Sequence, residues 1–210
     1  MTDWFLVSIS KRVIIMNFIK NILALVGLLA LIGGGLGYAK FGEDYKIFKS
    51  LDPKAGEVYW DMWQNLKRSR VTAEATVWVK EFDEGVTKED AEESMKLVAN
   101  EMNMKLVGEL PLSEQVFAET GEPQRFLKIF EFCDARTARL MVDYNVFISA
   151  YLPCRVSMVE RQDGTFALYS MNMDMILHGG ETLPPDLFKK ASRVKATILA
   201  VMEKGAAGDF

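Results

Sequence analysis

Histidine and cysteine are both scarce in this chain of 210 residues, which has one histidine, His178, and two cysteines, Cys133 and Cys154. A single histidine excludes the zinc centres that are built from several histidines, and two cysteines are too few for a disulfide scaffold. Only histidine titrates near neutral pH when its pKa is unperturbed. Acid–base catalysis would therefore have to use carboxylates, lysines or thiols.

An excess of positive charge is also missing. The chain has 25 basic and 29 acidic residues, which gives a net charge of −4. Proteins that bind nucleic acids usually carry a basic surface that faces the phosphates. The composition therefore predicts no nucleic-acid partner.

Charge is absent altogether from residues 22–39, which read ILALVGLLALIGGGLGYA. Together with residues 18–21, this run is long enough to cross a hydrocarbon core of ~30 Å as a helix that rises ~1.5 Å per residue. Five of its residues are glycine, which weakens helices in water. A membrane-spanning helix over residues 18–39 is therefore favoured over a buried helix of a soluble protein.

A cleaved signal peptide is the alternative interpretation of the same run. Met16 would then be the true start, and Gly37-Tyr38-Ala39 would be the cleavage site. The apolar region of a signal peptide usually spans about 7–15 residues, and this run is longer. An uncleaved anchor is therefore favoured.

Small residues follow one stripe of the expected membrane helix. They are spaced by three or four positions, and they are Gly27, Ala30, Gly34 and Gly37. Small side chains let membrane helices approach each other closely. This stripe predicts a helix–helix contact with an integral membrane protein partner.

The side of the membrane is predicted from the position of the anchor, because basic residues flank the run on both sides. A single anchor ahead of a folded domain predicts a single-pass protein of the bacterial inner membrane with a periplasmic domain. Residues 40–210 hold 22 basic and 28 acidic residues, a net charge of −6. Such a domain is repelled by anionic lipid, so membrane contact is expected through the helix alone.

The chain beyond the anchor predicts one α+β domain. We expect an N-terminal segment over residues 1–17, the anchor over 18–39, a polar linker with a short aromatic helix over 40–70, and the domain over 71–210. Strands are expected over 72–82, 104–110, 125–133, 154–161 and 165–173, the last two joined by an Asp-Gly hairpin turn. Helices are expected over 87–102, from Asp134 to Asp143, and after Pro184-Pro185. This order describes an antiparallel sheet packed by helices.

Two stretches carry a resemblance to a known family. They are KIFEFCD at residues 128–134 and YLPCRVSMVERQDGTFAL at residues 151–168, and they are followed by a terminal helix. Together they resemble the bacterial domain-of-unknown-function 302 (DUF302) family over roughly Thr72–Lys204. The resemblance implies a compact α+β fold with a curved antiparallel sheet, and it supplies no catalytic residue. The anchor and the aromatic segment before Val71 are additions to the family pattern.

The two cysteines are candidates for redox chemistry or a disulfide. Cys133 directly precedes Asp134, the expected N-cap of a helix, and a helix N-terminus lowers the pKa of a thiol, although the charge of Asp134 opposes this effect. Cys154 is followed by Arg155, whose charge also favours the thiolate. Three interpretations stay open: two small buried apolar residues, a disulfide, or a reactive pair that handles sulfur or attaches a cofactor.

A methionine cluster near the only histidine is a second candidate site. Met171, Met173 and Met175 alternate in the run MNMDM, and His178 follows. On a strand the three thioethers would share one face, and thioethers with an imidazole suit copper(I). The alternative is an apolar stripe that packs against the last helix, with His178 in a helix-ending turn. Copper is the only metal or cofactor that the sequence suggests.

No catalytic constellation is recognisable, so the leading hypothesis is a membrane-anchored accessory or binding subunit of a larger membrane complex. The aromatic segment Tyr59–Trp63 and the small-residue stripe support it. The alternatives are a thiol-redox or sulfur-handling protein that uses Cys133 and Cys154, and a copper(I)-binding protein.

Overall fold

The computed structural model describes residues 3–209, with side chains from Met16 onward. Residues 1–2 of the expected N-terminal segment, and the side chains of residues 3–15, lie outside the described part. The chain divides into two compact units, residues 1–50 and 51–210. The first unit is a single helix, α1 (Asp3–Ser50).

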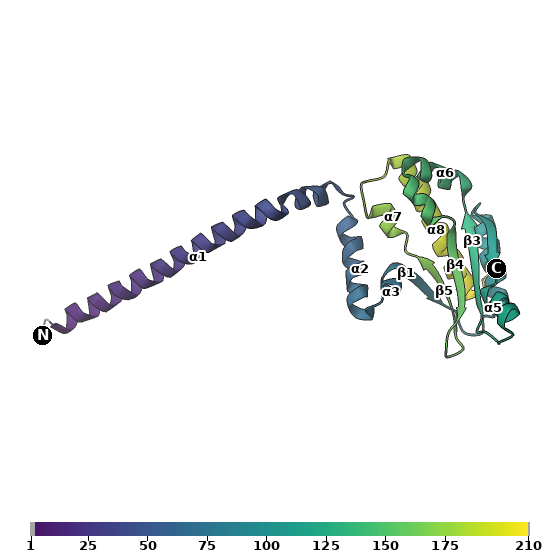
Figure 1. Cartoon of the computed structure of the whole chain (residues 1–210), viewed down its shortest axis with the longest axis horizontal. Helices are drawn as coiled ribbons and strands as arrows, with labels where there is room; N and C mark the ends of the chain where they lie inside the picture. Colours follow the sequence, from purple (N-terminus) through teal and green to yellow (C-terminus); the bar gives the residue numbers. More distant parts are fainter. Residues whose placement is uncertain (1–2, 210) are drawn as a thin grey trace. The chain divides into compact units, whose positions relative to one another are not determined.

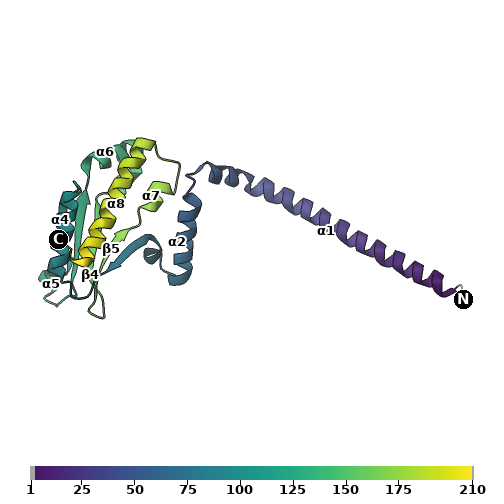
Figure 2. The same cartoon turned by 180° about the vertical axis from the view of Figure 1, so that it is seen from behind.

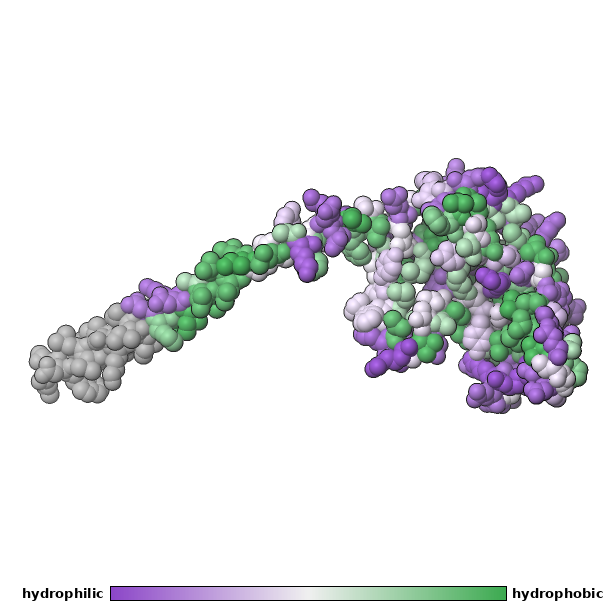
Figure 3. Space-filling model, in the orientation of Figure 1, coloured by the Kyte–Doolittle hydropathy of each residue, from purple (hydrophilic) through white to green (hydrophobic). Residues whose placement is uncertain are grey.

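Helix α1 contains the one stretch, among the described residues, that is long and apolar enough to cross a membrane. Figure 3 shows this stretch as a band of apolar residues on the helix, followed by polar ones. The helix continues to Ser50, through residues that we expected to form a polar linker, and this expectation was wrong. Lysine and glutamate favour helix, and the first proline after the apolar run is Pro53, so nothing in residues 40–50 stops the helix.

The second unit is built on a five-stranded antiparallel sheet, as Figure 1 shows. Its strands are β1 (Val77–Glu81), β2 (Lys105–Leu110), β3 (Leu127–Cys133), β4 (Cys154–Glu160) and β5 (Phe166–Met171). They lie in the order β1-β5-β4-β3-β2. Gly164 has a φ of +84° in the turn between β4 and β5, which confirms the hairpin predicted from Asp163-Gly164.

Two long helices cover one face of the sheet, as seen from behind in Figure 2. They are α4 (Lys88–Glu101), which begins with the expected capping box between Thr87 and Asp90, and α8 (Pro185–Ala207). Between helices and sheet lies the main core, in which Phe130, Phe132 and Met158 are fully buried. The predicted α+β fold is therefore confirmed.

Shorter helices surround this core. They are α2 (Ala55–Ser69), α3 (Thr72–Thr76), α5 (Leu112–Thr120), α6 (Ala135–Tyr144), the 3₁₀ helix η1 (Val146–Tyr151) and α7 (Asp174–His178). A second, smaller apolar cluster joins α6, α7 and α8 through Met141, Leu177 and Leu187.

Two local expectations were wrong. The strand expected from residue 72 begins only at Val77, because residues 72–76 form α3, where two alanines favour helix. The strand expected to continue to Met173 ends at Met171, so Met171, Met173 and Met175 do not alternate along one strand.

Candidate binding cleft

Three hollows adjoin one another at the end of the sheet where β5 ends and β4 begins. Tyr151, at the end of η1, and Met171, at the end of β5, line all three of them. We call the inner hollow, which has a volume of about 50 Å³, together with the two open ones of about 340 and 670 Å³, the cleft. Concave apolar surfaces of this size are where proteins usually bind ligands or partner segments.

Local sequence explains how η1 comes to line the cleft. The side chain of Asn145 accepts a hydrogen bond from the backbone N–H of Phe147 at 3.0 Å, which ends α6 and starts η1. The chain then passes through Leu152-Pro153 and enters β4 at Cys154. The 3₁₀ helix is thereby held beside the open ends of β4 and β5.

The inner hollow is lined almost entirely by apolar side chains and sulfur. Five sulfur-containing residues contribute to its wall, and they are Cys133, Met141, Cys154, Met171 and Met173. The remaining walls come from η1, α6, α7 and α8. The hollow is therefore soft and apolar, and Asp134 is the only ionisable carboxylate on its wall.

Both cysteines are free thiols. Their strands are neighbours, but Cys154 lies opposite Phe132 in the register of β3 and β4, one residue away from Cys133. Burial raises the pKa of Cys154 to about 11, and the neighbouring Cys133 adds to this effect, which Arg155 only partly offsets. Burial and the charge of Asp134 also raise the pKa of Cys133. The expected lowering of thiol pKa by the helix N-terminus is thus outweighed by burial.

Asp134 is used for structure. Its carboxylate accepts hydrogen bonds from the backbone N–H and the hydroxyl of Thr137 and pairs with Arg193 of α8 at 2.9 Å. Burial opposes ionisation, but these three contacts prevail and lower the pKa of Asp134. The carboxylate caps α6 and fastens it to α8, as the sequence predicted for the cap.

Large apolar side chains on the rim of the cleft face solvent. Phe147 is 80% exposed, and Tyr144, Val146 and Tyr151 are exposed beside it. Phe147 and Tyr144 line the largest hollow together with Ile176 of α7. A cluster of this kind is typical of a surface that contacts another molecule.

His178 lies outside the cleft and contacts the segment that precedes α2. Its Nδ1 is 3.0 Å from Oδ1 of Asp52, and both side chains are buried. The ring also packs edge-on against Phe188 at 5.4 Å.

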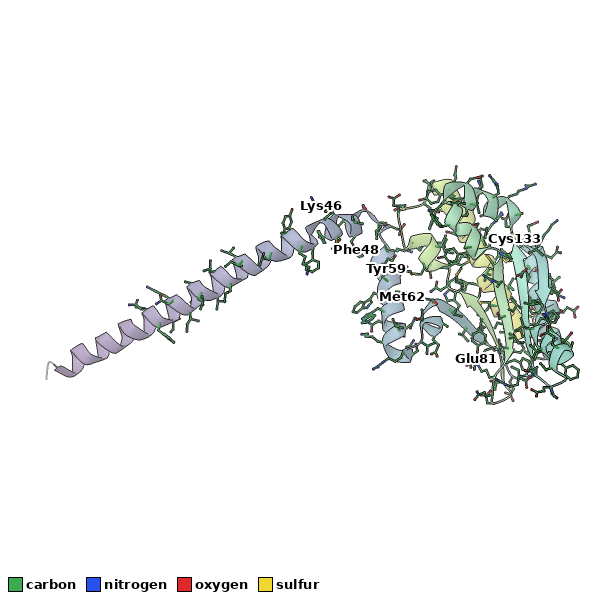
Figure 4. All side chains as sticks on the ribbon, in the orientation of Figure 1. Lys46, Phe48, Tyr59, Met62, Glu81 and Cys133 are labelled. Atoms are coloured by element: carbon green, nitrogen blue, oxygen red, sulfur yellow. The ribbon has the colours of Figure 1, made fainter. Side chains whose placement is uncertain are left out.

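Two further hydrogen bonds join the same two segments. Asp52 N–H donates to Gly180 O at 2.8 Å, and the Tyr59 hydroxyl of α2 donates to Gly179 O at 2.6 Å. Figure 4 labels Tyr59 on α2 beside α7. We call the contacts of Asp52 and Tyr59 with His178, Gly179 and Gly180 the clasp.

The structure therefore separates the residues of the methionine–histidine candidate. Met171 and Met173 join the cysteines around the inner hollow, Met175 lines the largest hollow, and His178 belongs to the clasp. Within residues 16–209 no three His, Cys, Asp or Glu side chains lie close enough together to hold a metal ion. Any metal in this cleft would depend on thiols and thioethers.

The small-residue stripe lies on α1, where a β-carbon added to Gly27, Gly34 or Gly37 would meet no atom within 4 Å. Sequence reasoning missed Tyr151, Ile148 and Ile176 as cleft residues. The only signal for Tyr151 and Ile148 was a set of apolar residues in a segment, 144–151, that continues no helical or strand pattern.

Comparison with known proteins identifies the second unit. Residues 80–205 match the family described as "Domain of unknown function DUF302". A similar solved structure is the uncharacterized conserved protein DUF302 from Bacillus stearothermophilus, with 15% identity and a TM-score of 0.48, covering 61% of this chain and 97% of that one. None of the curated proteins compared with the chain matches it.

Proposed function

Because this chain belongs to the DUF302 family, whose domain has no assigned activity, we propose that it is a membrane-anchored, non-enzymatic binding subunit. Helix α1 holds it in the bacterial inner membrane, with the DUF302 domain on the periplasmic side. The cleft contacts an apolar segment of a larger membrane complex.

The observation that carries this proposal is the exposed rim of the cleft. Phe147 exposes 80% of its surface beside hollows that are apolar. Burying a phenylalanine side chain contributes about 1.5–3 kcal/mol to association. An aromatic residue held out of the domain in this way is suited to insert into a partner.

Membrane anchoring is supported by the length and composition of α1. None of its apolar stretch is buried among the described residues. Connectivity adds a second argument, because the clasp holds the first residues after α1 to α7, which also lines the cleft. The cleft is thereby linked to the anchor through one short helix.

The native size of the protein in mild detergent tests this proposal. Wild-type protein is expected to run as part of a larger species, and Phe147→Ser is expected to release it. Phe117→Ser is the matched control, because Phe117 is also exposed, at 52%, but lies on α5, which contributes no residue to the cleft. Wild-type protein that elutes without any other component, or release by both variants, would contradict the proposal.

Soft-metal binding is a second candidate function, favoured by the five sulfur-containing side chains around the inner hollow. Thioethers and thiols are ligands that copper(I) prefers. Copper(I) titration against a competing chelator is expected to show weaker binding in Met171→Leu/Met173→Leu than in wild type. The control is Met62→Leu on α2, which lies outside the cleft and is labelled in Figure 4. Equal affinity in all three proteins would remove this candidate.

The thiol-redox alternative has less support, since burial raises the pKa of both cysteines. Thiolate is the reactive form of cysteine, and little of it forms at neutral pH when the pKa is raised. Alkylation with and without a reductant tests this alternative. Mixed disulfides at Cys133 or Cys154 in protein isolated without reductant would support it.

A further inference from the structure

Helix α1 carries a stripe of aromatic side chains that begins at the end of its apolar run and continues beyond it. The stripe consists of Tyr38, Phe41, Tyr45 and Phe48, spaced by three, four and three residues, and each is 50–72% exposed. Tyr45 and Phe48 lie six and nine residues past Ala39, which is roughly 9 and 14 Å along a helix. Lipid at the end of the apolar run can cover Tyr38, but these two rings extend past it.

The spacing of the stripe is that of a coiled coil. In a heptad with Tyr38 and Tyr45 at position a, Phe41 and Phe48 fall at position d. Gly34 and Gly27, inside the apolar run, fall at position d of the two preceding heptads. Position d therefore holds Gly27, Gly34, Phe41 and Phe48, which are spaced by seven residues. Bulky residues outside the run and small residues inside it therefore share one face of α1.

Charges of opposite sign flank the stripe where a parallel partner needs them. Asp44 falls at position g and Lys49 at position e of the following heptad, which are the positions that pair between two parallel helices. The ammonium of Lys49 already lies beside the stripe, 5.4 Å from the centroid of the Tyr45 ring. Two identical helices in parallel would form this Asp44–Lys49 pair twice, once on each side.

From these positions we propose that α1 forms a parallel homodimer through the face that carries Gly27, Gly34, Phe41 and Phe48. A second copy of this chain occupies the face, because Asp44 and Lys49 of two identical helices complete the charge pairing. Two copies anchored in the same membrane enter it in the same direction, so a parallel arrangement is the one available to them. This inference rests on the proposed membrane anchoring and is independent of what the cleft binds.

Oxidative cross-linking of the full chain in its membranes tests the dimer. Phe41→Cys and Phe48→Cys are each expected to give a product of twice the chain mass, and so is Gly42→Cys, which keeps all four aromatic rings. Glu43→Cys on the opposite face is the control, and the wild-type chain, with its two native thiols, measures the background. Helix geometry separates the faces, as Figure 4 shows for Lys46 and Phe48, which project to different sides of α1.

The outcomes separate this inference from the proposed function. Cross-linking that is equal on both faces, absent from the stripe, or found in a product of another mass overturns the homodimer and leaves anchoring intact. Absence of the chain from the membrane fraction overturns both. Persistence of the dimer in Phe147→Ser is expected, because that change affects the cleft alone.

Charge reversal gives a second test, in which the cross-linking cysteine stays at one position. Asp44→Lys is expected to lower the cross-linked fraction of Gly42→Cys by roughly two- to fivefold, since it places like charges together. Adding Lys49→Asp to Asp44→Lys restores opposite signs and is expected to recover the dimer. Failure of the double change to recover it would overturn the parallel pairing.

Discussion

At the C-terminal end of α7, His178 and the two glycines after it contact Asp52 and Tyr59, and these polar groups have partners at hydrogen-bonding distance. Within α7, Ile176 and Leu177 line hollows whose other walls carry thiols, thioethers and exposed aromatic rings. The same five-residue helix therefore contributes to both the clasp and the cleft, and Gly179 and Gly180 of the clasp also line the largest hollow.

The polar residues of the clasp are used to hold the structure together, whereas the apolar residues of the cleft are left to contact other molecules. A buried histidine–carboxylate pair is often part of a catalytic site. Here the pair joins two segments that are far apart in the sequence. The cleft has apolar area and few charges, which suits binding better than acid–base chemistry.

Removing the histidine of the clasp should have the largest effect. His178→Ala removes the imidazole from the buried carboxylate of Asp52 and removes the packing against Phe188. We expect a loss of about 2–3 kcal/mol in the free energy of unfolding. Urea denaturation measures it, and Lys54→Ala, an exposed change in the same segment, should alter stability by less than about 0.5 kcal/mol. A loss no larger than that of Lys54→Ala would show that the clasp is dispensable.

Alkylation of Cys154 tests whether the cleft lacks a reactive thiol. With its pKa raised to about 11, Cys154 should react with iodoacetamide at pH 8 on the order of a hundredfold more slowly than an ordinary thiol, and the rate should climb as pH rises toward 11. Mass spectrometry of the native protein follows the modification, with urea-unfolded protein as the reference. Equal rates in the two states would mean that the cleft holds a reactive thiol.

Acid should weaken the clasp. The Lys54 N–H and the contact with His178 outweigh burial and lower the pKa of Asp52 below its usual value. A carboxyl whose pKa is depressed on folding stabilises the protein above its unfolded pKa, near 3.9, and this stabilisation is lost as pH falls below that value. Unfolding free energies at pH 7 to 3 should therefore fall less steeply in Asp52→Asn than in wild type. If the unfolding free energies of wild type and Asp52→Asn fall equally with pH, groups other than Asp52 cause the loss of stability in acid.

The smallest expected effect is that of the Tyr59 hydroxyl. Tyr59→Phe removes one hydrogen bond, to Gly179 O, from a side chain that is 38% exposed, so a loss of about 0.5–1 kcal/mol is expected. Tyr144→Phe is a matched control, because Tyr144 is 41% exposed and its hydroxyl makes no hydrogen bond within residues 16–209. Thermal unfolding of both variants measures the difference, and equal shifts would argue against a role for this bond.

Local sequence was enough to predict most elements of the domain. Thr87 with Asp90, Asp134, and Asp163-Gly164 each act within a few residues, and all three formed the expected caps and turn. The last helix buries Leu187 and Ile198 as its spacing predicted. Short elements were missed: α5 spans nine residues and ends at Gly121, and its apolar pattern is too brief to stand out.

The candidate site was harder to predict, because it depends on contacts between distant residues. Asp52 and His178 are 126 positions apart, and nothing near either of them shows that they meet. Cys133 and Cys154 were recognised as neighbours if their strands paired, which β3 and β4 do. Their raised pKa values depend on burial by η1, α6 and α7, which no local pattern reveals.

The clasp also has a mechanical consequence. Any pull on α1 enters the domain at residues 51–54, and Asp52 passes it directly to His178 at the end of α7. Because α7 supplies Ile176 and Leu177 to the inner hollow, the clasp joins the residues that follow α1 to a wall of the cleft. In a chain anchored through α1, as we propose, a load on the anchor would therefore reach the surface with which the cleft holds its partner.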